Sequence, residues 1–362
     1  AGPEHQALGV LYDRRAATFT AALVLEGHSF ALLGGEEKER RVTGWSGVLA
    51  ALAREGSPVH RIQWLAMALP DDGRAVRAYL NEWAVGSDDT ARRSYAELLA
   101  EVGAETSRHV VLLAVQVRAG RRQPEGFGGP MGSLAREVAN VQRLLSVADV
   151  GCRGPLEPAR LATMIRTFGL ADPPMLTESA EDIGEPARVC PVAAPWPMGT
   201  EAEWGRVRTD STWHATYWVS EWPRIDVGPD FLAPLLLGPS RRSVAVVMEP
   251  VSPSRAVRAV ERSRTADIAD SELRRRGGFL ATARRAREAE LVVRRESELA
   301  EGHGSYRFSG YVTVTAATLA ELEESCDATE HAAGQAHLEL RRLYGDQERA
   351  LLCTLPLCRG LS

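Results

Sequence analysis

The chain has 362 residues, of which 44% are hydrophobic and 25% are charged, a globular rather than a disordered composition. Its net charge of −5 gives no whole-chain argument for binding nucleic acid or a membrane surface. Lysine occurs only as Lys38, inside an acidic run, which excludes a P-loop, a Schiff-base lysine and a kinase lysine. We therefore expect that the protein is not an enzyme.

The first half of the chain predicts strands and helices in a regular order. Side chains alternate between apolar and polar along the strands, and apolar residues recur at helical spacing in the helices. The predicted elements are a strand at 19–25, a helix at 42–52, a strand at 61–69, an insertion with two short helices, a strand at 110–117, a helix at 134–145, a short strand at 151–156 and a helix at 158–168.

The second half repeats this order of elements. Thr318 and Glu321 predict a capping box that begins a helix. The predicted elements are a strand at 212–224, a short helix at 231–237, a strand at 243–248, a long polar and helical segment at 255–301, a strand at 306–315, the capped helix after it and a last strand near 349–355.

The two halves together predict an α+β protein made of two ferredoxin-like (split βαβ) halves. Each half carries a helical insertion between its second and third strands. We place the first domain at 1–171 and the second at 206–362, which includes an arginine-rich helical hairpin at 255–301. Proline and glycine crowd the stretch between the domains, so residues 172–205 are predicted to be a linker.

No motif in the sequence predicts catalysis, a cofactor or a metal site. The eight histidines and five cysteines are scattered, without His-x-x-x-His or Cys-x-x-Cys spacing, and there is no Gly-x-Ser-x-Gly elbow. We expect no catalytic residue, no cofactor and no bound metal. One alternative stays open, in which scattered acids such as Asp267 and Asp270 surround a metal.

The strand over 213–222 is rich in aromatic residues. Two sets of side chains alternate along it, with Trp213, Tyr217 and Val219 on one face and His214, Trp218 and Trp222 on the other. One interpretation is a central strand that is buried on both sides. The other is that one face docks a partner, with Trp218 and Trp222 as its binding residues.

The segment from 255 to 296 holds twelve arginines against seven acidic residues, a local net charge of +5. One interpretation is a solvated helix with internal ion pairs. The others are contact with an acidic protein face, anionic lipid headgroups or nucleic acid, although the interleaved aromatic residues of a single-strand binder are absent. The candidate partner-binding arginines are Arg274, Arg275, Arg276, Arg284, Arg285 and Arg287.

The chain resembles a known family over nearly its whole length. Residues 94–99 and 109–117, the glycine-rich loop and the helix at 134–145 resemble EccE, a membrane-anchored component of actinobacterial type VII (ESX) secretion systems. Five further segments are similar to EccE-like proteins of actinobacterial conjugation-type gene clusters: 57–64, 213–224, 226–232, 306–314 and 354–360. The first strand-helix-strand unit and Leu355-Pro356-Leu357 are also similar to the non-motor N-terminal domain of type IV secretion ATPases.

This resemblance implies a non-catalytic structural component of a secretion or conjugation machine at the cell membrane. The chain is then the soluble, cytoplasmic part of a protein whose membrane anchor it lacks. Its expected partners are other machinery subunits, including a motor ATPase, and further copies of itself. The alternative function is a nucleic-acid-binding accessory protein of a conjugative element, acting through the arginine-rich segment.

Overall fold

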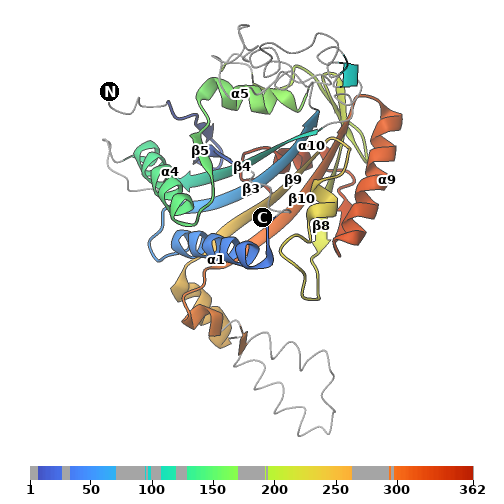
Figure 1. Ribbon diagram of the computed structural model, residues 1–362. Helices are drawn as coiled ribbons and strands as arrows, with labels where there is room; N and C mark the ends of the chain where they lie inside the picture. Colours follow the sequence, from blue (N-terminus) through green and yellow to red (C-terminus); the bar gives the residue numbers. More distant parts are fainter. Residues whose placement is uncertain are drawn as a thin grey trace, which may run out of the picture.

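The computed structural model describes residues 7–26, 33–70, 94, 97–98, 107–119, 129–169, 192, 195–262, 293–294 and 297–361. It shows a mixed fold with one large antiparallel sheet (Figure 1). The strands are β1 (Leu11–Asp13), β2 (Thr18–Leu25), β3 (Val59–Pro70), β4 (Ser107–Arg118), β5 (Cys152–Pro155), β6 (Thr200–Ala202), β7 (Val207–Thr209), β8 (Thr212–Glu221), β9 (Arg242–Val251), β10 (Ser305–Ala316) and β11 (Glu339–Arg342).

The helices lie between these strands in the chain. They are α1 (Gly35–Leu52), α4 (Pro130–Val147), α5 (Pro158–Thr167), α6 (Ala233–Leu236), α9 (Leu319–Gln335) and α10 (Gln347–Leu351), followed by the 3₁₀ turn η2 (Leu352–Thr354). None of the helices that can be described is both long enough and apolar enough to cross a membrane.

The two halves of the chain contribute strands to the sheet in the same spatial order. That order is β5-β2-β4-β3 in the first half and β11-β8-β10-β9 in the second. The halves meet where β3 pairs with β9, with Leu65 opposite Ala245. Hydrogen bonding is therefore continuous from one half to the other.

Helices cover both faces of the sheet. On one face, α1 and α4 pack over the first half, and α6 and α9 pack over the second (Figure 1). On the opposite face, α5 and the α10–η2 segment pack over the centre. Side chains alternate between the two faces along a strand. On β3, Ile62 therefore points into the core under α1 and α4, whereas Leu65 points into the core under α5 and the α10–η2 segment.

The only lysine of the chain links the two halves on the helical face. Lys38, in the first turn of α1, lies 3.2 Å from the Asp230 carboxylate, which precedes α6. α1 begins earlier than the predicted helix at 42–52, so the acidic run around Lys38 forms its first turn, where Glu36 and Glu37 suit the positive end of the helix dipole. The capping box of Thr318 and Glu321 is confirmed.

The prediction of a last strand at 349–355 is wrong. Those residues belong to α10 and η2, and the last strand of the second half is β11 instead. Gln347, Ala350, Leu351 and Thr354 are buried at the i, i+3, i+4, i+7 spacing of a helix, and Cys353 and Leu355 are buried beside them. Part of the predicted linker also has regular structure, because β6 lies within 172–205 and joins the sheet through β7.

Buried glutamines tie the C-terminal segment to both halves of the sheet. The Gln63 side chain on β3 donates to the Cys353 carbonyl at 2.8 Å and accepts from the Cys358 N–H at 2.7 Å. The Gln347 side chain accepts from the N–H of Thr216 on β8 at 2.7 Å and donates to its carbonyl at 3.0 Å. The segment therefore bridges the junction between the halves.

We predict that Gln63→Leu lowers the free energy of unfolding by about 2–5 kcal/mol, because the buried Cys353 carbonyl and Cys358 N–H both lose their partner. Urea denaturation measures this change. The control is Gln335→Leu, since Gln335 is exposed on α9. A loss for Gln63→Leu no larger than that of the control contradicts the prediction.

A candidate docking edge beside an apolar pocket

β6 is the last strand at one end of the described sheet, and its outer edge is open. The Asp210 N–H donates to the Gly199 carbonyl at 3.1 Å, and the Glu203 N–H donates to the Arg206 carbonyl at 2.8 Å. In an antiparallel ladder, residues that hydrogen-bond across to the neighbouring strand alternate with residues that do not. Because Gly199 and Glu203 bond toward β7, Thr200 and Ala202 direct their backbone N–H and C=O groups away from it. An edge of this kind is a template for a further strand.

Large apolar side chains are exposed at both ends of β6. Trp196 and Met198 precede it, with exposed fractions of 46% and 90%, and Trp204 follows it at 74%. Trp204 stacks on Tyr344, with ring centroids 6.5 Å apart, and its carbonyl accepts the Gly345 N–H at 2.7 Å. Exposed groups of this kind mark interaction surfaces, where tryptophan and tyrosine carry much of the binding energy.

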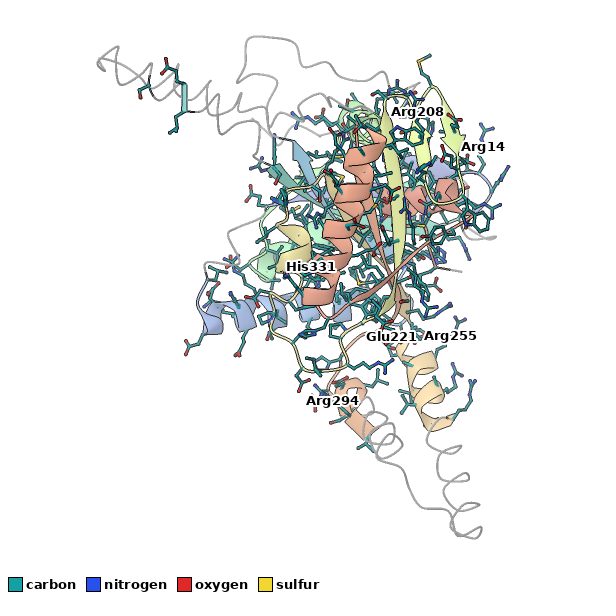
Figure 2. The ribbon with its side chains drawn as sticks, turned by 90° about the vertical axis from the view of Figure 1, so that its right-hand side faces the viewer. Arg14, Arg208, Glu221, Arg255, Arg294 and His331 are labelled. Carbon is teal, nitrogen blue, oxygen red and sulfur yellow. The ribbon has the colours of Figure 1, made fainter. Side chains whose placement is uncertain are left out.

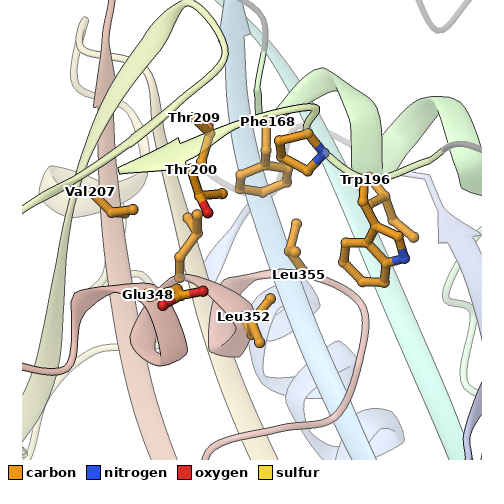
Figure 3. Close-up of a pocket in the computed structure, with 11 residues that line it drawn as sticks. Phe168, Trp196, Thr200, Val207, Thr209, Glu348, Leu352 and Leu355 are labelled. Atoms are coloured by element: carbon orange, nitrogen blue, oxygen red, sulfur yellow. The ribbon is translucent and has the colours of Figure 1, made fainter. Parts of the chain in front are cut away.

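A pocket of about 190 Å³ lies next to this edge (Figure 3). Trp196 and Glu348 are exposed, and they extend from opposite sides of the pocket in Figure 3. Most of its walls are apolar, and they come from α5, α10, η2, β6, β7 and the segment that leads into β6. The lining residues are Ile165, Phe168, Trp196, Pro197, Thr200, Val207, Thr209, Glu348, Leu351, Leu352 and Leu355.

A buried histidine supports one wall of the pocket. His214 Nε2 lies 2.6 Å from the Thr209 hydroxyl and 3.0 Å from the Thr212 hydroxyl, and Nδ1 lies 2.9 Å from the Thr315 hydroxyl. Burial, together with the smaller effect of the positive charge of Arg241, lowers the pKa of His214 to about 3. The imidazole is therefore neutral near pH 7, and it holds Thr209 in place.

The structure places the predicted pair Trp218 and Trp222 on opposite faces of the sheet. Trp218 donates from Nε1 to the Ser309 hydroxyl at 2.9 Å, whereas Trp222 packs edge-to-face on Phe308, with ring centroids 5.3 Å apart. Ser309 and Phe308 are neighbours on β10, so their side chains point to opposite faces. The expected shared face was wrong because β8 ends at Glu221, before the alternation reaches Trp222.

The rest of the aromatic strand fits the interpretation of a buried central strand. His214, Thr216 and Tyr217 are all almost fully buried, and they lie on both faces. Trp218 is the exception, with 37% of its surface exposed. Along 214–217, burial in the core therefore accounts for the large side chains on both faces of the strand.

The six candidate arginines, Arg274, Arg275, Arg276, Arg284, Arg285 and Arg287, lie outside the described residues, as do Asp267 and Asp270. Helical residues at 253–262 and 297–300 flank the segment that contains them. Both flanking pieces extend away from the sheet, and Figure 2 labels Arg255 and Arg294 there. The role of the arginine-rich segment stays a prediction.

The β6 edge was missed by the sequence interpretation. Its exposed residues, Trp196, Met198 and Trp204, all fall within the predicted linker. The sequence feature that could have indicated this edge is the presence of large apolar residues among the prolines and glycines, since a simple linker is expected to be polar. The strand itself has only three residues, too few for an alternating pattern to be recognised.

No protein family model matches the chain, and no curated protein is significantly similar to it. Across the described ranges, no group of three or more histidine, cysteine, aspartate or glutamate side chains is placed to hold a metal ion. What the geometry offers at the β6 edge is binding, through backbone hydrogen bonds along the strand and apolar contact in the pocket.

We predict that protein stability falls as the pH drops from about 6.5 toward 3, in part through His214. The ordinary pKa of 6.5 applies to the unfolded chain, whereas the folded value is about 3. Between these values the unfolded state binds one more proton, so this group lowers the free energy of unfolding by about 1.4 kcal/mol per pH unit.

Urea denaturation at pH 7, 6, 5 and 4 measures this slope. His214→Gln is expected to show a flatter dependence on pH, whereas His331→Gln, at an exposed histidine of α9, keeps the original slope. Equal slopes for the two variants contradict the prediction.

Proposed function

We propose that the protein is a non-catalytic docking component of a secretion or conjugation machine at the actinobacterial cell membrane. The observation that carries the docking role is the β6 edge, where an open strand lies between exposed Trp196, Met198 and Trp204. The resemblance to EccE-like proteins supports the choice of machine. Its partners are other subunits of that machine, among them a motor ATPase.

We also infer that each half is a ferredoxin-like unit with an insertion between its second and third strands. The equal strand orders β5-β2-β4-β3 and β11-β8-β10-β9 support this inference. So do the equivalent places of α1 and α6, after the first strand, and of α4 and α9, after the third. Joining two such units through β3 and β9 uses one edge of each and leaves the outer ends for partners.

We predict that a photo-crosslinking residue in place of Ala202 captures a subunit of the secretion or conjugation machinery in the source organism. Ala202 is exposed, and its backbone faces the open edge. Mass spectrometry of the cross-linked product identifies the partner. The same residue in place of His331, on α9, is the control and is expected to give no such product.

Two further variants test the exposed tryptophans. Trp196→Ser and Trp204→Ser are each expected to lower recovery of that subunit about tenfold, as truncation of an interface hot spot does. Tyr12→Ser is the matched control, because Tyr12 is an exposed aromatic residue of β1, at the opposite end of the sheet from β6. Recovery of no machinery subunit by the unaltered chain contradicts the proposed function.

A further inference from the structure

We propose that the β6 edge and the adjacent pocket bind one ligand together. That ligand is an extended segment of a partner protein, which adds a strand to β6. It inserts one apolar side chain into the pocket and places a lysine or arginine beside Glu348. This inference rests on the proposed docking function and specifies the chemistry of the partner.

The strand addition follows from the geometry of Thr200. Its backbone groups face the open edge, while its side chain lines the pocket. An added strand directs every second side chain to the same face of the sheet as Thr200 and Ala202. Backbone pairing at the edge therefore brings a ligand side chain toward the pocket, the arrangement by which strand-adding peptides gain specificity.

The size and walls of the pocket select an apolar side chain. About 190 Å³ is below the several hundred cubic ångströms of sites for drug-sized molecules, so it suits a single bulky side chain. Ile165, Phe168, Leu351 and Leu355 supply apolar surface from two sides of the pocket. The Thr209 hydroxyl is already engaged with His214, so it adds little polarity.

The negative charge of Glu348 beside the pocket favours a ligand that carries a basic residue next to its inserted apolar residue. Glu348 is exposed at the pocket, and no ion pair to it is formed within the described ranges. The nearby cation Arg166 is already committed, because it lies 2.9 Å from the Asp210 carboxylate. A basic side chain on the ligand gives Glu348 a partner of opposite sign.

A second copy of the same chain is the poorer occupant. Two β6 strands paired antiparallel about their central residue place the two Glu201 side chains opposite each other. Like charges directly opposite in a sheet are destabilising. A different protein with a basic segment avoids this repulsion.

A random heptapeptide library displayed on phage, panned against the whole chain, tests the proposal. Enriched peptides are expected to carry a large apolar residue within two positions of a lysine or arginine. Synthetic copies of these peptides are then measured by fluorescence anisotropy. Enrichment of acidic peptides, or of none, overturns the proposal.

Three variants examine the three parts of the site. Thr200→Trp fills the pocket, Glu348→Lys reverses its charge, and Ala202→Pro removes an edge N–H without breaking the β6–β7 pairing. Each is expected to weaken binding of the selected peptide at least tenfold. The matched controls are Glu201→Trp, at a residue on the opposite face of β6, and Glu324→Lys, at an exposed position of α9. Urea denaturation confirms that every variant is folded.

The outcomes separate this inference from the proposed function. If Thr200→Trp and Glu348→Lys bind the peptide as the unaltered chain does, the combined site is wrong. If cross-linking at position 202 captures a machinery subunit equally well in the Thr200→Trp background, the docking function stands and the pocket has no part in it. If position 202 captures no machinery subunit in the unaltered chain, the proposed function itself fails.

Discussion

The side chain of Gln63 is buried on β3, the strand where the two halves of the sheet meet, and both ends of its amide bind the C-terminal segment. A buried amide that lost these partners would destabilise the fold, because water cannot replace them there. Gln347 makes the equivalent connection to β8 in the other half. The paired strands β3 and β9 are thereby covered by a segment that is anchored on both sides of their junction.

The docking edge depends on this cover. Glu348, Leu351 and Leu352 reach the pocket only because α10 packs on β8 and η2 packs on β9 and β10. From the other side, α5 supplies Ile165, so the pocket wall joins residues from the first half to residues from the end of the chain. A change that releases the C-terminal segment is therefore expected to remove the pocket as well as to lower stability.

The aromatic residues and histidines of this sequence are candidates for a binding surface, but the structure shows that some are buried in the core and others are exposed. Tyr217 and His214 belong to the core, where neighbouring hydroxyls satisfy the imidazole. Trp196 and Trp204 are exposed beside an open strand, where nothing in the core explains them. Residue type alone did not distinguish these cases, because the same kinds of large aromatic side chain occur in both places.

Local patterns in the sequence determined most of the helices and strands. The alternation over 19–25 and the Thr318 capping box were sufficient, because strand periodicity and helix caps depend on residues a few positions apart. Only the tertiary structure decided that Leu65 pairs with Ala245 and that β6 is an open edge. Each of these depends on contacts between distant parts of the chain, which short-range patterns do not encode.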